Sequence, residues 1–190
     1  MDKLPIYYIS IEEAVDGIEK MSLVEHPAVE RDFLKFKTSS EQVCFSVADP
    51  DKHIVFGVAI LADTPIYRRR GDFEFYTVFT KEIIEELVEK FFKEDRIKDV
   101  NLEHFKDIEG ATLIESIITR PGVSIDAFKD VPEGSWIVGY KIDNPVLWED
   151  IKQGKYKGFS IEGLFSFLDE KEEEKKKKSP LTTLLEDLTK

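Results

Sequence analysis

The sequence predicts an α+β fold built mainly of antiparallel strands, with two helices beside them. Short runs of β-forming residues recur along most of the chain, separated by glycine, proline, asparagine and aspartate. Two segments carry helical signals instead. The 190 residues, 42% of them hydrophobic, are enough to bury one core of ordinary size. We therefore expect one folded domain with a short appendage.

The strands are expected at nine places: residues 4–11, 43–47, 54–61, 65–70, 73–79, 100–105, 111–119, 135–142 and 157–167. Residues 54–61 are almost continuously apolar, which is typical of a strand covered on both faces. Gly71-Asp72 predicts a hairpin between the strands on either side of it. Asp107-Ile108-Glu109-Gly110 would turn the chain between residues 100–105 and 111–119 in the same way.

Two segments in the first third of the chain lack the pattern of a strand. Asp16-Gly17-Ile18 indicates a turn. Residues 21–37 mix apolar residues with His26-Pro27, and proline disfavours a helical conformation at the residue before it. We expect this second segment to be extended or irregular.

The clearest helix is predicted over residues 81–95. Thr80 is placed to cap its first turn. Its apolar side chains form one stripe opposite a charged face: Ile83, Ile84, Leu87, Val88, Phe91 and Phe92. A shorter helix is expected after Asn144-Pro145, because asparagine is a favoured cap and proline suits the first helical position. Gly154 marks its end.

The composition changes after Leu168. Residues 169–178 are all charged, and a leucine stripe at helical spacing follows at Leu181, Leu184, Leu185 and Leu188. A helix this short is not stable alone. We expect a domain over residues 1–168, a charged flexible linker over 169–179 and a short amphipathic helix over 180–190.

The charge and the cysteine content argue against several classes of protein and kinds of site. A net charge of −12 disfavours general nucleic-acid binding, which needs clustered positive charge. No apolar run is long enough for a membrane helix, and the N-terminus lacks a signal-peptide pattern. Cys44 is the single cysteine, which excludes an intramolecular disulfide and a cysteine-rich zinc site. With no metal-ligand spacing and no glycine-rich phosphate loop, we expect no cofactor.

Ser160 lies in a setting that suits a nucleophile. In Gly158-Phe159-Ser160-Ile161-Glu162-Gly163 it points to the strand face opposite its apolar neighbours. The flanking glycines would let a substrate backbone approach. The second glycine comes one residue too late for the nucleophile elbow of the α/β-hydrolases. From spacing alone, a serine on the solvated face of a strand is the favoured interpretation.

His104 is the strongest candidate for the general base that a serine nucleophile requires. If Glu109-Gly110 form the centre of a hairpin turn, residue 104 pairs with Glu115, which could orient the imidazole across the strands. A slip of one residue would move Glu115 to the opposite face. Taken alone, a surface His–Glu pair is the favoured interpretation.

Three other residues carry less weight as candidates. His26 precedes Pro27 and is expected in a turn, and His53 is expected to face solvent in a loop. Cys44 lies between Val43 and Phe45 and is expected to be a buried, inert thiol.

Several segments, in this order, resemble those of the phage serine proteases of the XkdF type, a branch of the prohead (capsid maturation) proteases. They occupy residues 21–30 (MSLVEHPAVE), 57–68 (GVAILADTPIYR), 101–104 (NLEH), 113–116 (LIES), 134–141 (GSWIVGYK) and 147–163, which ends in YKGFSIEG. Together they span about residues 5–168 and leave the tail uncovered.

The wider clan resembles the herpesvirus assemblin fold, which implies a β-barrel-like core with flanking helices. The resemblance also implies that Ser160 is the nucleophile and His104 the base. In the herpesvirus enzymes the third member is a second histidine after the nucleophile, and this chain has no histidine after residue 104. Glu115 is our candidate for that place, with Asp107 and Asp126 in reserve. Backbone N–H groups or a bound water would stabilise the oxyanion.

The function implied is a serine endopeptidase that cleaves scaffold and major capsid proteins during phage head maturation. It would act inside the procapsid, in the bacterial host cytoplasm during assembly. The C-terminal helix either docks on a partner (scaffold, shell or another copy of the chain, as a homo-oligomer) or is a frayed end, and the two alternatives carry equal weight. A catalytically silent scaffolding or virion-interior protein of the same fold is the alternative. An unrelated binding module would leave the shared order of motifs unexplained.

Overall fold

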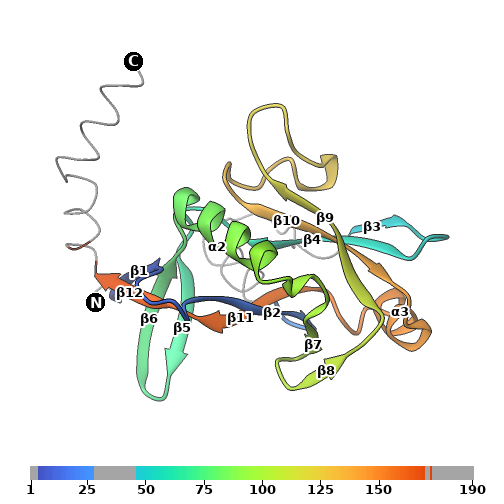
Figure 1. Ribbon diagram of the computed structural model, residues 1–190, viewed down its shortest axis with the longest axis horizontal. Helices are drawn as coiled ribbons and strands as arrows, with labels where there is room; N and C mark the ends of the chain where they lie inside the picture. Colours follow the sequence, from blue (N-terminus) through green and yellow to red (C-terminus); the bar gives the residue numbers. More distant parts are fainter. Residues whose placement is uncertain (1–3, 28–45, 170–171, 173–190) are drawn as a thin grey trace.

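The computed structural model describes residues 4–27, 46–169 and 172, and the strands of this part form three four-stranded sheets (Figure 1). The first sheet has the order β12 (Ser166–Asp169), β1 (Ile6–Ser10), β6 (Phe73–Val78), β5 (Ile66–Arg70). The second has the order β11 (Gly158–Leu164), β2 (Gly17–Val24), β7 (Val100–Leu102), β8 (Lys106–Ile108). The third has the order β3 (Ser46–Asp49), β4 (Ile54–Ile60), β10 (Trp136–Ile142), β9 (Ala111–Ile118).

The strands pair mainly in antiparallel fashion, as the sequence predicts. In the described chain the β1–β6 and β2–β7 pairs are the parallel ones. The barrel-like core expected from the resemblance is not found, because none of these three sheets closes on itself in the described residues. Consecutive strands belong to separate sheets instead of continuing one curved sheet. This is so for β1 and β2, and for β11 and β12.

Both predicted helices form where their caps place them. The helix α2 (Lys81–Lys93) begins at Thr80, whose hydroxyl accepts the Ile83 N–H, and it buries Ile84, Leu87, Val88 and Phe91. Phe92, predicted on the same stripe, is exposed. The helix α3 (Pro145–Lys152) begins at Asn144, and Gly154 follows with a φ of 74°. The described residues also contain two short 3₁₀ turns, η1 (Arg96–Lys98) and η2 (Asp126–Phe128).

Two predictions about strands are wrong. The turn expected at Asp16-Gly17-Ile18 does not form, because Gly17–Val24 is the central strand β2; residues 21–24 are therefore extended, which was one of the two alternatives expected for residues 21–37. The alternation that identifies strands is weak there because residues 21–24 are buried throughout. The strand expected over residues 157–167 is two strands in different sheets, separated at Phe165 after a bulge at Glu162/Gly163.

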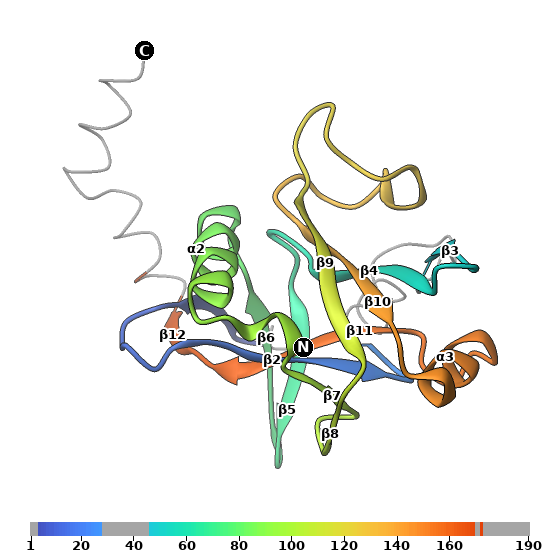
Figure 2. The same ribbon diagram turned by 45° about the vertical axis from the view of Figure 1, so that its right-hand side comes forward.

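Aromatic contacts join the second sheet, the third sheet and α2 around the main core. Phe91 of α2 packs on Trp136 with ring centroids 5.5 Å apart. Tyr140 of the third sheet packs on Phe159 of the second sheet, with ring centroids 5.0 Å apart. In both Figure 1 and Figure 2, the β5–β6 hairpin projects to one side of this body and the connection between β9 and β10 to the other.

Some expectations fall outside the described residues. The charged linker and the leucine-rich helix of the tail do so, apart from Asp169 and Glu172, as do residues 28–37 and Cys44. No helix in the described part is long and apolar enough to cross a membrane.

Candidate active site

A groove of about 680 Å³ lies where the first and second sheets meet. Ser160 and His104, which are 56 residues apart in sequence (160 − 104), both line it. His26 lines it as well, just beyond the end of β2. Apolar side chains from both sheets and from the crossing between β11 and β12 form part of the walls: Ile9, Phe75, Phe79, Ile161, Phe165 and Phe167. The structure therefore brings the predicted nucleophile and base to one concave surface.

Ser160 has a second serine beside it on the neighbouring strand. Ser160 of β11 pairs with Ser22 of β2, so the two side chains share one face of the sheet. Ser22 is fully buried, whereas Ser160 is half-buried and lines the groove. Since a nucleophile must reach a substrate, Ser160 is the better placed of the two.

His104 sits in a tight turn between β7 and β8. The Phe105 N–H donates to the Leu102 carbonyl at 3.0 Å, and both central residues have left-handed backbones, with φ of 51° at Glu103 and 63° at His104. Such conformations cost about 1 kcal/mol or more for residues other than glycine, and they concentrate at functional sites. The Glu103 carboxylate accepts the Glu25 N–H at 2.6 Å, which anchors the turn to the end of β2.

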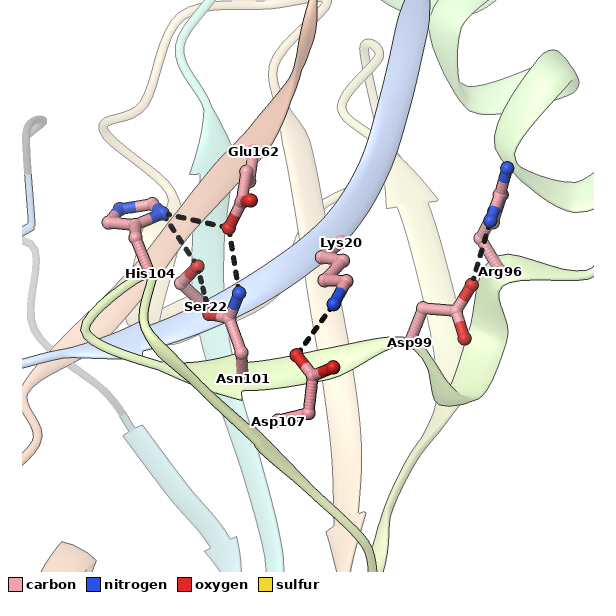
Figure 3. A network of polar contacts seen from close by, with 8 residues as sticks. All are labelled: Lys20, Ser22, Arg96, Asp99, Asn101, His104, Asp107 and Glu162. Carbon is pink, nitrogen blue, oxygen red and sulfur yellow. Dashed lines mark hydrogen bonds and ion pairs between the residues drawn. The ribbon is translucent and has the colours of Figure 1, made fainter.

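A network of hydrogen bonds holds one side of the imidazole (Figure 3). The His104 Nδ1 lies 2.8 Å from Ser22 Oγ and 3.5 Å from Glu162 Oε2. Ser22 Oγ donates to Asn101 Oδ1 at 2.5 Å, and Asn101 Nδ2 donates to Glu162 Oε2 at 2.7 Å. Ser22 and Asn101 are buried, and Glu162 is about one-third exposed (37%). The second ring nitrogen of His104 points away from this network in Figure 3.

The predicted pairing of His104 with Glu115 is wrong. The strand β7 pairs with β8, so Val100 lies opposite Ile108, and β9 pairs with β10, where Glu115 lies opposite Gly139. The strand expected over residues 100–105 ends at Leu102, and the tight turn at Glu103 and His104 takes the place of the wider hairpin. Glu162 is the carboxylate beside the imidazole.

The reserve carboxylates have other surroundings. Asp107 accepts a hydrogen bond from Lys20 Nζ at 2.6 Å, also drawn in Figure 3, and Asp126 begins η2. His53, expected to face solvent, is half-buried and stacks on Trp148 with ring centroids 4.7 Å apart. No group of three or more His, Cys, Asp or Glu side chains within the described ranges could hold a metal ion.

The glycines around Ser160 serve the packing of β11 and not an opening for substrate, which corrects our expectation. A Cβ at Gly158 would lie 2.6 Å from Cγ of Pro27. A Cβ at Gly163 would lie 2.0 Å from the carbonyl oxygen of Gly17. Because other groups already fill both spaces, the groove and not the glycines provides access to Ser160.

Comparison with known proteins relates this geometry to a family. A family model described as "Putative phage serine protease XkdF" matches residues 42–169. The chain belongs to this family. One curated member, the phage-like element PBSX protein XkdF of Bacillus subtilis (strain 168), is 30% identical over 153 residues, which cover 80% of this chain and 48% of that protein. The chain thus spans about half the length of this XkdF relative. No solved structure matches, so the likeness to the assemblin fold stays a prediction.

Three residues of this candidate site were missed in the sequence: Ser22, Asn101 and Glu162. Glu162 had a readable signal, because it lies two residues after Ser160 and therefore on the same strand face. Asn101 had a weaker one, as a polar residue between Val100 and Leu102 in a strand. Ser22 gave none, since its importance depends on the pairing of β2 with both β11 and β7.

Proposed function

We propose that this XkdF-family protein is a serine endopeptidase in which Ser160 attacks the peptide carbonyl and His104 is the general base. The observation that carries this proposal is the direction of the hydrogen bonds behind His104. Ser22 has a single hydroxyl proton and donates it to Asn101, so its oxygen can only accept from the imidazole. Nδ1 then carries the proton, and the other nitrogen, Nε2, has the lone pair that a base requires.

In the reaction, Nε2 of His104 takes the proton of the Ser160 hydroxyl as that oxygen attacks the carbonyl carbon. The imidazolium formed is stabilised by the Glu162 carboxylate, 3.5 Å from Nδ1. His104 then donates the proton to the leaving amine, and water releases the acyl group from Ser160 by the reverse sequence. Asn101 is a positioning residue, because it fixes both Glu162 and Ser22 without reaching the substrate.

The biological substrates we propose are the scaffold and major capsid proteins of the phage that encodes this chain. This proposal is supported by the family to which the chain belongs, because the description of that family names a phage serine protease. The site of action would be the procapsid interior, and the fold a variant of the assemblin type. We further propose that residues 1–168 form the catalytic domain, with residues 169–190 docking on scaffold, shell or another copy of the chain.

Coexpression with these two proteins tests the proposal. The wild-type chain should cleave at least one of them, and Ser160→Ala should abolish cleavage while leaving the melting temperature within a few degrees. Ser124→Ala, at an exposed serine beyond β9, is the matched control and should cleave normally. Undiminished cleavage by Ser160→Ala would refute the nucleophile. Absence of any cleavage by the wild type would favour the alternative of a catalytically silent head protein.

A further inference from the structure

Four aromatic side chains lie together on one face of the first sheet, and we call them the aromatic shelf: Tyr7 of β1, Phe73 and Phe75 of β6, and Phe167 of β12. Tyr7 is at the centre. Its ring centroid lies 6.5 Å from that of Phe73, 5.7 Å from that of Phe75 and 6.5 Å from that of Phe167. Phe73 stacks on Phe75 with centroids 5.3 Å apart. The four rings therefore form one continuous apolar surface across three strands.

The shelf is open to solvent although its rings contact one another. Phe73 and Phe167 are each 50% exposed, and Tyr7 and Phe75 are only partly buried. A half-exposed phenylalanine leaves on the order of 100 Å² of apolar surface in water. Apolar side chains scattered singly over a surface need no explanation, but exposed rings that adjoin one another are typical of a binding surface.

The shelf is continuous with the groove that contains Ser160. Phe75 and Phe167 belong to both, because each of them also lines the groove. Ile9 and Thr77 lie on the same face of the first sheet and line the groove as well. A molecule that enters the groove beside Ser160 therefore meets the shelf. This continuity identifies the occupant of the shelf as the peptide on which Ser160 is proposed to act.

The spacing of the rings along β6 suits an extended peptide. Phe75 and Phe73 are two residues apart on one strand, which corresponds to about 7 Å. Side chains on one face of an extended peptide recur at the same interval. A peptide that runs beside β6 can thus place one side chain over Phe75 and the next side chain of that face over Phe73. Since the rings present a flat surface without charge, the side chains that cover them best are large and apolar.

We propose that the aromatic shelf is a specificity subsite of the groove, and that it selects peptides with a large apolar side chain a few residues from the bond beside Ser160. This substrate class rests on the proposed function, since it names what the same site accepts. It makes Phe73 a specificity-determining residue, although Phe73 is outside the groove and contributes nothing to the hydrogen bonds behind His104.

Selection from a random dodecapeptide display library tests the recognition without requiring cleavage. Full-length Ser160→Ala protein is the bait, compared with versions that also carry Phe73→Ala or Phe92→Ala. Phe92 is the matched control, because it is 45% exposed on α2 and is not among the residues that line the groove. Bound peptides should share an aromatic residue, leucine or methionine at one position. Replacing that residue by serine should weaken binding about tenfold or more.

Phe73→Ala should abolish this preference, and Phe92→Ala should retain it. Phe73→Thr, which keeps a strand-forming residue, takes its place if Phe73→Ala lowers the melting temperature. Peptides without a shared large apolar residue, or equal effects of Phe73→Ala and Phe92→Ala, would overturn the inference.

Sedimentation velocity of the wild type and of Phe73→Ala tests whether another copy of the chain occupies the shelf. We expect both proteins to sediment alike. An oligomer that Phe73→Ala dissociates would assign the shelf to self-association and overturn the inference.

Digestion of the selected peptides by the wild-type chain separates this inference from the proposed function. Binding that depends on Phe73, without cleavage, would leave the recognition intact and refute the peptidase. Cleavage with no preference for large apolar residues, and equal in Phe73→Ala, would do the opposite.

Discussion

Glu162 sets the orientation of every hydrogen bond around His104. A carboxylate can only accept, so Asn101 must present its amide N–H to Glu162 and its oxygen to Ser22. Ser22 must then donate to Asn101 and accept from Nδ1. One acidic side chain thus selects the tautomer of a histidine whose Nδ1 it approaches only at 3.5 Å.

Glu162→Gln should therefore damage catalysis more than the loss of one weak contact would. The new amide can donate, so Asn101 can turn over and reverse the whole series of hydrogen bonds. We expect kcat to fall by roughly 10²- to 10⁴-fold, the range for loss of a group that orients a catalytic histidine.

Glu115→Gln is the matched control for that experiment. Glu115 is exposed on β9 and lies opposite Gly139 in the third sheet, so its replacement should leave kcat unchanged. If Glu115→Gln were as damaging as Glu162→Gln, the assignment of the orienting carboxylate would be wrong.

At the scale of elements, the position of β11 against β2 depends on Gly163. The bulge between Glu162 and Gly163 brings the carbonyl of Gly17 to where a side chain would begin, 2.0 Å from an added Cβ. Gly163→Ala must separate the two strands that carry Ser160 and Ser22. We expect a loss of about 2 kcal/mol or more in the free energy of unfolding, measured in urea, together with reduced activity.

Gly154→Ala offers a comparison for this strand contact. Its φ of 74° is unfavourable for alanine, but nothing lies within 4 Å of the added Cβ. The loss should stay near 1 kcal/mol, with activity retained. Equal effects of the two alanine variants would contradict the close approach at Gly163.

The loop between β1 and β2 is closed by a buried carboxylate, Asp16. It accepts the N–H groups of Glu12 and Glu13 at 2.8 and 3.0 Å. Burial acts to raise the pKa of Asp16, but these hydrogen bonds, the Ser166 hydroxyl and Lys90 outweigh it and lower the pKa below its ordinary value. The stabilisation is therefore complete above the pKa of the unfolded chain, about 3.9, and is lost as pH falls through the lower pKa of the folded state.

Asp16→Asn should accordingly be less stable than the wild type at pH 7, by about 1–3 kcal/mol for hydrogen bonds to a charged group. The difference should shrink as the pH falls below about 4, because the wild-type carboxyl also loses its charge there. Urea unfolding of both proteins between pH 3 and pH 7 measures this. A gap that does not change with pH would mean that the charge of Asp16 does not stabilise the fold.

At the scale of the whole molecule, local signals in the sequence were reliable and long-range pairings were not. Thr80 and Asn144 cap helices where their side chains predict them, since capping involves residues three or fewer positions away. The Ser22–Asn101 bond joins residues 79 positions apart, and no local pattern specifies it. Ser160 and His104 were predicted from the resemblance to the XkdF-type proteases, and both line one groove; the carboxylate beside His104 was misassigned because its position depends on how distant strands pair.

The position of the groove follows from the way the chain is divided among the three sheets. The first sheet is connected directly to the second where β1 is followed by β2 and where β11 is followed by β12, and the groove lies at the junction of these two sheets. Ser160 and Glu162 come from one sheet, and Arg68 from the other. Residues of both sheets therefore form the walls of the groove.

The central claim, that Ser160 is a nucleophile activated by His104, is tested most directly by reaction of the full-length chain with a fluorophosphonate, followed by peptide mapping in a mass spectrometer. This measurement requires no knowledge of the natural substrate. We predict a single phosphonylated residue, Ser160, and loss of that label in His104→Ala with the fold retained. Labelling of a different serine, no labelling at Ser160, or undiminished labelling of Ser160 in His104→Ala would contradict the account.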